Sequence, residues 1–320
     1  MWYSNIEKYF NLQPALLKKL LLILFVLYGF YGSSQTKAAR PNSTNSGNPS
    51  QLGSKKYRAA TTNSELDTLK HNICVNKQFS VVFYIVLDTL VTGPSPGLGF
   101  ATPTNIAYMM SEVNEAFAPI CVSFSTCGVY IIPNHNYGKS WTKSGIEPAV
   151  TAAYYTDQTI NIYLVDSCFI GLGNLEPEGY TYMPTLANLA TPKKDLLVIE
   201  KYKLLQLNGG VANHLMGHYF GLPHTHDEIA PIPAAVPPPP VVGIASQEFV
   251  DGSNCHVHGD GFCDTEADPG DNLFLVDGMG NYYMYPFDNF MSVYSSKNRF
   301  SQEQYNFMAY TILQKRMYLH

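Results

Sequence analysis

Charged residues are scarce in this chain, at 14% of its 320 positions, and the net charge at neutral pH is −5. Nucleic-acid binding through phosphates needs a basic surface, so this composition argues against a nucleic-acid partner. A C-x-x-C pair is also missing among the six cysteines, which argues against a zinc ribbon. The hydrophobic fraction, 46%, is that of a globular protein, and the length permits one large domain or two smaller ones.

A long apolar run is missing as well, and the one near the N-terminus is short. Leu20–Gly32 is too short for a comfortable membrane span, which needs about 20 residues. Lys18 and Lys19 precede this run, and Ser33 and Ser34 follow it. A basic end, a short apolar core and small residues predict a secretory signal peptide over residues 1–34. We therefore expect an exported protein with no membrane segment after cleavage, and a retained N-terminal anchor is the main alternative.

The next segment, residues 35–77, is interpreted as a disordered linker or a propeptide remnant, because Thr36–Thr62 is polar and has no apolar period. Residues 78–320 form the predicted domain. Cysteines in an exported chain are expected to pair as disulfides. Six cysteines allow fifteen pairings, and local spacing favours Cys255 with Cys263 and, secondarily, Cys121 with Cys127.

Apolar patterns predict an α/β arrangement in the first half of this domain. Phe79–Leu87 is β-branched, aromatic and almost wholly apolar, as in a strand buried on both faces. Thr102 and Pro103 are typical of a helix start, and this helix is expected to end at Pro119. The remaining predicted elements are two short strands in Ile120–Pro133 about Cys127-Gly128, strands Thr159–Val165 and Leu196–Tyr202, a loop over Asp166–Tyr182, and a helix over Gln302–Leu313.

Three histidines lie close together in Val211–His226, within the segment VANHLMGHYFGLPHTH. His214 and His218 are four residues apart, which places both imidazoles on one face of a helix. Gly221 permits a positive φ that ends the helix, and His224 follows after the turn. Three neutral imidazoles that converge in this way are typical of an open zinc site.

The pattern H-x-x-x-H-x-x-G-x-x-H resembles the zinc-binding motif of the metzincin metallopeptidases, and GHYFGLPHTH resembles the pappalysin or cytophagalysin type. The family has glutamate after the first histidine, where this chain has Leu215. That glutamate is the general base for the attacking water, not a zinc ligand. The resemblance therefore implies the zinc ligands without the usual base. Alternatively, Leu215 is a core residue of a filled cleft.

Further segments extend the resemblance to the C-terminus. Gly179–Pro184 resembles the family's edge segment, where an extended peptide would add as a strand, and an ordinary tyrosine-rich edge is the alternative. Asn254–Pro269 resembles a family loop in which Asp260 and Asp264 would hold calcium. Asn289–Ser296 resembles the Met-turn, with Met291 as the floor beneath the histidines. The family's oxyanion-supporting tyrosine is replaced by Val293, and Tyr294 stands one residue later.

The resemblance implies an α/β (α+β) metzincin-type metallopeptidase fold with two subdomains. It has a twisted mixed sheet, a zinc-binding active-site helix, and an irregular C-terminal half that starts after Gly221. The implied function is that of a secreted zinc metallopeptidase homologue acting on peptides or proteins, impaired or inactive here because the base is missing. Two alternatives stay open. One is an active peptidase with a relocated base, for which Asp227 and Glu228 would have to fold back. The other is a non-catalytic secreted binding or adhesion domain with vestigial histidines.

Overall fold

A computed structural model of the chain describes residues 72–90, 98–139, 141–171, 174–175, 179–205, 209–228, 247–270, 276–294 and 296–320. All of them belong to one unit, Leu52–His320. The predicted signal peptide and residues 35–71 of the predicted linker lie outside the described residues. Within the described ranges, none of the helices has the length and hydropathy needed to cross a lipid bilayer.

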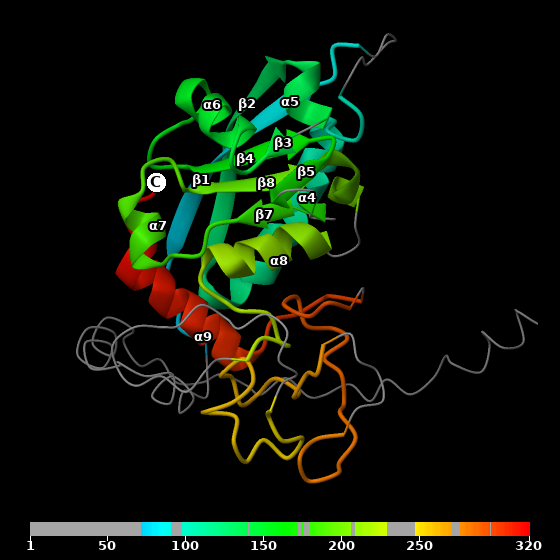
Figure 1. The fold of residues 1–320 in the computed structure, drawn as a ribbon. Helices are drawn as coiled ribbons and strands as arrows, with labels where there is room; N and C mark the ends of the chain where they lie inside the picture. Colours follow the sequence, from blue (N-terminus) through cyan, green and yellow to red (C-terminus); the bar gives the residue numbers. More distant parts are fainter. Residues whose placement is uncertain are drawn as a thin grey trace, which may run out of the picture. The chain divides into compact units, whose positions relative to one another are not determined.

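A five-stranded sheet forms the centre of the described unit (Figure 1). Its strand order is β2-β1-β4-β8-β7. The first four strands are parallel, and β7 pairs with β8 in the antiparallel sense at one edge. The sheet is therefore mixed. The bounds of its strands are β1 (Lys77–Leu87), β2 (Val122–Pro133), β4 (Ile160–Val165), β7 (Gly179–Thr181) and β8 (Leu196–Glu200).

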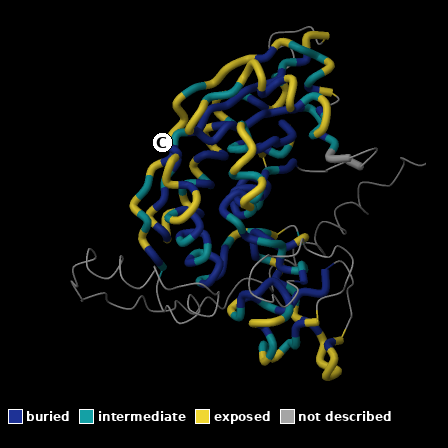
Figure 2. Tube along the Cα trace, turned by 60° about the vertical axis from the view of Figure 1, so that its left-hand side comes forward, coloured by how far each residue is buried: buried dark blue, intermediate teal, exposed yellow. Residues whose placement is uncertain are grey.

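Helices cover both faces of this sheet, which explains why its central strands are apolar throughout. One face of β1 packs with α4 (Pro103–Phe117) and α8 (Gly210–Tyr219) in the larger core cluster. The other face joins a second cluster that includes Val150 of α6 (Ile146–Ala153). Figure 2 shows buried residues throughout the sheet and exposed ones along the outer connections. The predicted double burial of the first strand is confirmed.

The remaining elements are short and lie mostly around the sheet. The helical ones are the 3-10 segments η1 (Ala118–Ile120) and η2 (Lys201–Leu205), with α5 (His135–Lys139) and α7 (Leu186–Ala190). A small second sheet joins β3 (Trp141–Thr142), β5 (Cys168–Gly171) and β6 (Asn174–Leu175). The prediction of a plain loop over Asp166–Tyr182 was therefore wrong. Strands of two to four residues are too short to show a period in the sequence.

The predicted pair of strands about Cys127-Gly128 was also wrong, because β2 runs without interruption through both residues. The register between β1 and β2 shifts at this point, since Val81 pairs with Thr126 and Val82 pairs with Gly128. Cys127 is the extra residue of a β-bulge. A bulge absorbs one residue without ending a strand, so the glycine does not create a turn here.

One predicted disulfide is confirmed and the other was wrong. Cys255 is bonded to Cys263, but Cys121 is bonded to Cys74 rather than to Cys127. Cys121 and Cys127 stand six residues apart along an extended segment, a distance of about 20 Å. A disulfide needs α-carbons less than about 7 Å apart. The α-carbons of Cys74 and Cys121 are 4.9 Å apart.

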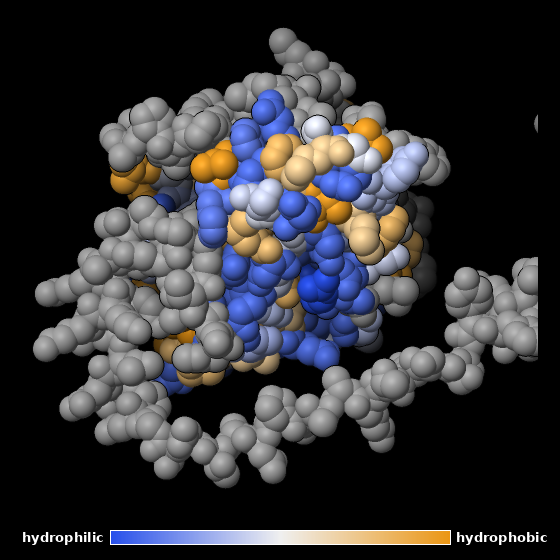
Figure 3. Space-filling model, turned by 90° about the horizontal axis from the view of Figure 1, so that it is seen from below, coloured by the Kyte–Doolittle hydropathy of each residue, from blue (hydrophilic) through white to orange (hydrophobic). Residues whose placement is uncertain are grey.

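The part of the chain after α8 is irregular, as expected. Buried carboxylates take the place of regular backbone pairing there. Asp277 accepts hydrogen bonds from the backbone N–H groups of Val250, Met279 and Asn281. Figure 3 views the molecule from below and shows polar residues over most of the coloured surface, with apolar ones in small groups. The fold class, an α/β unit with a mixed sheet, a histidine-bearing helix and an irregular C-terminal half, is confirmed.

The chain returns to the sheet through α9 (Gln302–Thr311) and a final turn, η4 (Ile312–Arg316). Ser301 begins α9 with a reciprocal cap, because its side chain accepts from Gln304 N and the Gln304 side chain accepts from Ser301 N. The last residue, His320, donates its backbone N–H to Gln158 O at 2.8 Å. The C-terminal segment thus packs beside the loop before β4.

Candidate metal centre

Helix α8 and the turn after it bring three imidazoles together. His214 and His218 lie one turn apart on α8, and Gly221, with φ of 101°, turns the chain so that His224 returns to them. His218 Nε2 lies 3.1 Å from His214 Nε2 and 3.0 Å from His224 Nε2. Two nitrogens bound to one tetrahedral zinc ion lie about 3.3 Å apart, so these distances fit such an ion.

The opposite ring nitrogens are held from outside this centre. His214 Nδ1 lies 2.7 Å from Phe290 O, and His218 Nδ1 lies 2.7 Å from Leu222 O. Carbonyl oxygens only accept, so each of these Nδ1 atoms carries the proton and each Nε2 presents its lone pair. The lone pairs of His214 and His218 face each other at 3.1 Å and repel one another, and a shared cation removes the repulsion. The donor set therefore fits a metal ion.

The electrostatic environment keeps the imidazoles of His214 and His218 neutral. Burial, followed by the neighbouring His218 ring, lowers the pKa of His214 well below its usual value. Burial, followed by the His224 ring, lowers the pKa of His218 to about 3. Lys297 Nζ, 3.4 Å from His214 Nδ1, acts in the same direction. Neutral imidazole is the form that binds a metal, so His214 and His218 are in the binding form at neutral pH.

Asp227 orients the third histidine. Its Oδ2 accepts from the His224 backbone N–H at 2.8 Å and lies 3.2 Å from His224 Nδ1. Burial opposes ionisation of this carboxyl, but the hydrogen bonds from His224 outweigh burial and lower its pKa. Carboxylate–histidine pairs of this kind support metal ligands from outside. Asp227 thus lies on the outer side of the His224 ring and not on the Nε2 side.

Glu228 is likewise engaged away from the three histidines. Its carboxylate accepts from Gln247 N and Gly259 N, each at 3.0 Å, and lies 2.6 Å from His258 Nδ1. The side chain is 9% exposed. For either carboxylate to become a general base at the centre, it would have to give up these bonds.

Met291 lies directly against the histidine-bearing helix. It is fully buried, and a β-carbon placed on Gly217 would lie only 2.4 Å from Met291 Sδ. The backbone carbonyl of Met291 also accepts from Thr225 N at 3.2 Å. Gly217, which lies between His214 and His218 in the sequence, therefore allows Met291 to pack closely against α8. No motif in the sequence pointed to this glycine.

Leu215 fills the place where the resemblance implies a glutamate. It is 4% exposed and belongs to the larger core cluster. Its Cδ1 would lie 3.0 Å from a β-carbon placed on Gly179, the first residue of the edge strand β7. The side chain thus packs as a core residue between α8 and β7.

Val293, which stands where the family has its oxyanion-supporting tyrosine, and Tyr294, the candidate to take over that support, lie in different surroundings. Val293 is 41% exposed. The Tyr294 hydroxyl lies 2.9 Å from Gly270 O and 3.2 Å from Asp268 Oδ1, and its ring packs against Phe287 with centroids 4.9 Å apart. Tyr294 is therefore tied to Asp268 and Gly270.

The candidate calcium ligands serve as local hydrogen-bond acceptors. Asp260 is 1% exposed and accepts from Phe262 N and Thr265 Oγ1, each at 3.0 Å. Burial raises the pKa of Asp260 well above its usual value. Asp264 accepts from Glu303 N at 2.9 Å. Hence Asp260 stabilises its own loop, and Asp264 joins this loop to the first turn of α9.

Among the described residues, two further groups of three candidate ligands have their ligand atoms within 4.8 Å of one another: His224, His226 and Asp227, and Cys255, His256 and Cys263. The first group shares a histidine with the centre described above. The sulfur atoms of the second group form a disulfide, so it offers no thiolate. Within the described part of the chain, neither Asp260 nor Asp264 belongs to such a group.

Comparison with known proteins gives distant relatives of one kind. No protein-family model matches the chain. An extracellular metalloprotease of Pyricularia oryzae is 24% identical over 168 residues, which are 51% of this chain and 57% of the relative. An extracellular metalloprotease of Sordaria macrospora is 25% identical over 162 residues, 47% of this chain and 53% of the relative. The chain thus spans little more than half the length of the curated relatives it matches.

Solved structures of mirolysin are also similar to this chain. Mirolysin in complex with a compound has 17% sequence identity and a TM-score of 0.49, covering 74% of this chain and 91% of mirolysin. Mature mirolysin of Tannerella forsythia with a cleaved peptide has 18% identity and a TM-score of 0.48, covering 75% and 91%.

Proposed function

We propose that this chain is an exported homologue of the extracellular metalloproteases, that it binds one zinc ion through His214, His218 and His224, and that its peptide hydrolysis is impaired or absent. The observation that carries the proposal is the convergence of the three Nε2 atoms, at 3.0 and 3.1 Å, with two Nδ1 atoms held by carbonyl oxygens. The names of the two curated relatives support the same class. Imidazole donors in this arrangement favour zinc among the common metals.

The residues of this chain can perform only part of the chemistry of a metallopeptidase. A zinc ion, when bound, supplies a Lewis acid that polarises a peptide carbonyl and acidifies water. His214, His218 and His224 would hold and orient that ion, and Met291, buried against α8, would form the floor beneath them. Proton acceptance needs a further group, and Leu215 has no lone pair. The nearby carboxylates of Asp227 and Glu228 already accept other hydrogen bonds.

A peptide or protein ligand is the partner class that this proposal implies. Strand β7 lies at the edge of the main sheet, beside Leu215 of α8. An extended peptide could pair with that edge even where hydrolysis is slow. The burial of Leu215 favours a binding role over a working peptidase with a relocated base. Calcium binding by Asp260 and Asp264 stays a prediction, and metal analysis of the purified protein tests it.

Metal analysis together with a peptide-cleavage assay tests the proposal. The purified domain should contain about one zinc ion per chain, and His218→Ala should lose it. The wild-type chain should cleave a mixed peptide substrate little or not at all. A metal-free protein whose stability is unchanged by a chelator would refute the zinc site. Robust cleavage that a chelator abolishes would refute the impairment and favour a relocated base.

Export is the cellular part of the proposal, and it rests on Lys18, Lys19 and the apolar run Leu20–Gly32. The two disulfides fit an oxidising compartment. N-terminal sequencing of protein from the native host should find a mature start after Gly32. Retention of Met1 would contradict the predicted signal peptide.

A further inference from the structure

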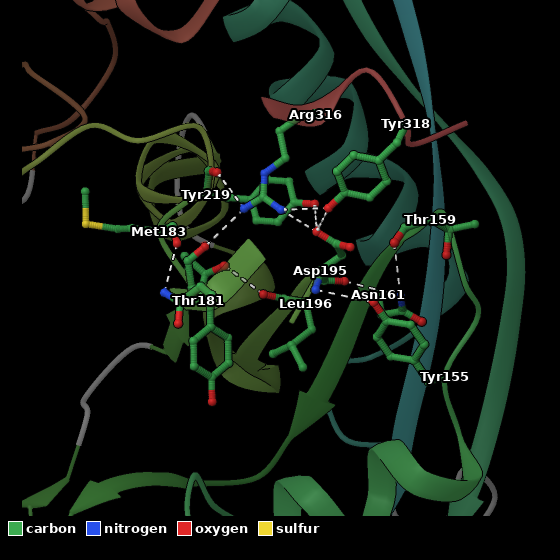
Figure 4. A network of polar contacts seen from close by, with 12 residues as sticks. Tyr155, Thr159, Asn161, Thr181, Met183, Asp195, Leu196, Tyr219, Arg316 and Tyr318 are labelled. Atoms are coloured by element: carbon green, nitrogen blue, oxygen red, sulfur yellow. Dashed lines mark hydrogen bonds and ion pairs between the residues drawn. The ribbon is translucent and has the colours of Figure 1, made fainter. Parts of the chain in front are cut away.

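Arg316, at the end of η4, lies beside Tyr219, the last residue of the histidine-bearing helix (Figure 4). It is 2% exposed. Its Nη2 donates to Tyr219 O at 3.2 Å and to Tyr182 O at 3.3 Å. The guanidinium carbon lies 3.9 Å from the centre of the Tyr219 ring. One side chain therefore contacts both the last residue of α8 and the chain that leaves β7.

A single carboxylate completes this contact. Asp195 Oδ1 pairs with Arg316 Nη1, and it also accepts from Tyr219 OH at 3.0 Å and Tyr318 OH at 2.6 Å. Figure 4 shows these groups converging on Asp195, just before β8. We call Asp195, Tyr219, Arg316 and Tyr318 the Arg316 cluster. The carboxylate of Asp195 compensates the charge of the guanidinium within this cluster. A planar, multidentate donor suits such a site better than an ammonium group.

The end of α8 decides the position of the middle histidine. A helix leaves its last carbonyls without intrahelical partners, and Arg316 takes the carbonyl of Tyr219. His218 precedes Tyr219 directly and lies in the last helical turn. The outer contact of His218 Nδ1 is Leu222 O, which belongs to the turn that follows. The backbone position of His218 and its contact with Leu222 O therefore both depend on how the end of α8 and the following turn are held in place.

The other two histidines are held differently. His214 contacts Phe290 O, and His224 contacts Asp227, so neither depends on Leu222 O in the turn directly after α8, as His218 does. His218 lies next to both of their Nε2 atoms. A small displacement of His218 therefore changes both of its distances to the other ligands.

We infer that Arg316 is a positioning residue for the metal centre, because it fixes the end of α8 and with it the ligand geometry of His218. This inference rests on the proposed zinc site. It assigns a role in metal binding to a residue 98 positions beyond His218 in the sequence, outside every recognised motif. Through Tyr182 O, the same side chain also fixes the chain after β7, the strand that faces Leu215.

Metal affinity and cobalt spectroscopy of the full chain test the inference. The variants are Arg316→Gln, which removes the charge, and Arg316→Lys, which keeps it but loses the planar donor set. The matched control is Asp88→Asn, since Asp88 is 4% exposed and paired with His135 and Lys139 of α5 rather than with α8. Zinc affinity is measured by competition with a chelator, and ligand geometry is read from the visible bands of the Co²⁺-substituted protein.

We expect Arg316→Gln to bind zinc about tenfold more weakly, with altered cobalt bands; this is the lower end of the roughly 10–100-fold range for groups that contact a metal ligand directly, because Arg316 acts through Tyr219. Arg316→Lys should lie between Arg316→Gln and the wild type, and Asp88→Asn should match the wild type in both readouts. Wild-type affinity and bands in Arg316→Gln would show a purely structural role and overturn the inference alone. If Arg316→Gln does not fold, the same comparison of Arg316→Lys with the wild type decides the matter. Failure of the wild-type chain to bind zinc overturns the proposed function and this inference together.

Discussion

Replacing Leu215 by glutamate is the most informative single change in this chain. The substitution restores the residue that the metzincin resemblance implies at the one position where the ligand motif departs from it. A positioned general base contributes about 10²–10⁴-fold in rate, equivalent to about 2.7–5.5 kcal/mol of barrier. Leu215→Glu should therefore raise peptide cleavage by a factor in this range. The rate should stay below that of an intact peptidase, because Val293 stands where the resemblance implies an oxyanion-supporting tyrosine, and loss of one oxyanion donor costs about 10²–10³-fold in other enzymes.

The structure predicts a stability cost for the same substitution. Leu215 is 4% exposed and packs towards Gly179, so its replacement loses about 1.5–3 kcal/mol of apolar burial. A buried carboxylate adds a desolvation penalty. Zinc at about 1,000 times its dissociation constant would return about 4.1 kcal/mol to the folded state. The variant should thus unfold more easily without zinc and recover most of its stability with it.

A quenched fluorescent peptide mixture, assayed with and without chelator, measures the gain in rate. Leu215→Gln is the matched control, since it has the same shape as glutamate and no basic oxygen of comparable strength. Thermal unfolding with excess zinc shows whether each variant is folded and loaded. If Leu215→Glu holds zinc but cleaves no faster than Leu215→Gln, the missing base is not what limits this protein, and the surroundings of the centre have diverged as well.

Two further predictions concern stability. Burial, followed by the charges of neighbouring carboxylates, raises the pKa of Glu248 to about 8, so the folded state binds more protons than the unfolded state between pH 4.5 and 8 and stability falls as pH rises through that window. Glu248→Gln should remove a pH dependence on the order of 4 kcal/mol from the free energy of unfolding. Urea unfolding at pH 5 and pH 8 measures this, and an equal change in the free energy of unfolding for both proteins would contradict the prediction. The two disulfides close loops with sequence separations of 47 and 8, so loss of Cys74–Cys121 should lower the free energy of unfolding by about 4 kcal/mol and loss of Cys255–Cys263 by about 2.5 kcal/mol. Paired serine substitutions and denaturant titration measure both losses. A larger loss for Cys255–Cys263 than for Cys74–Cys121 would refute the loop-entropy argument.

Several features of the fold could be predicted because neighbouring residues encode them. The apolar run Phe79–Leu87 predicts a strand buried on both faces, and β1 is such a strand. Thr102 and Pro103 mark the start of α4, and the Thr102 side chain accepts from Asn105 N as a helix cap does. These signals involve residues a few positions apart, so local sterics and hydrogen bonding decide them.

Other features depended on residues far apart in the chain and were missed. Cys74 pairs with Cys121 across 47 residues because β1 and β2 run side by side in parallel. Spacing along the sequence favoured Cys127 as the disulfide partner of Cys121, and only the extended conformation of β2 excludes that disulfide. Spacing along the sequence does not measure distance in space once a strand extends the chain.

The sequence by itself determined how the three candidate ligands come together: His214 and His218 share a helix face by their spacing, and Gly221 supplies the turn that brings His224 back. Only the tertiary structure decided what surrounds them. It buries Leu215 against β7, engages the carboxylates of Asp227 and Glu228 elsewhere, and brings Arg316 to the end of α8. The physical reason is that the helix period and the glycine turn depend only on residues a few positions apart in the sequence. Burial and long-range hydrogen bonds depend instead on which distant segments the packed core brings together.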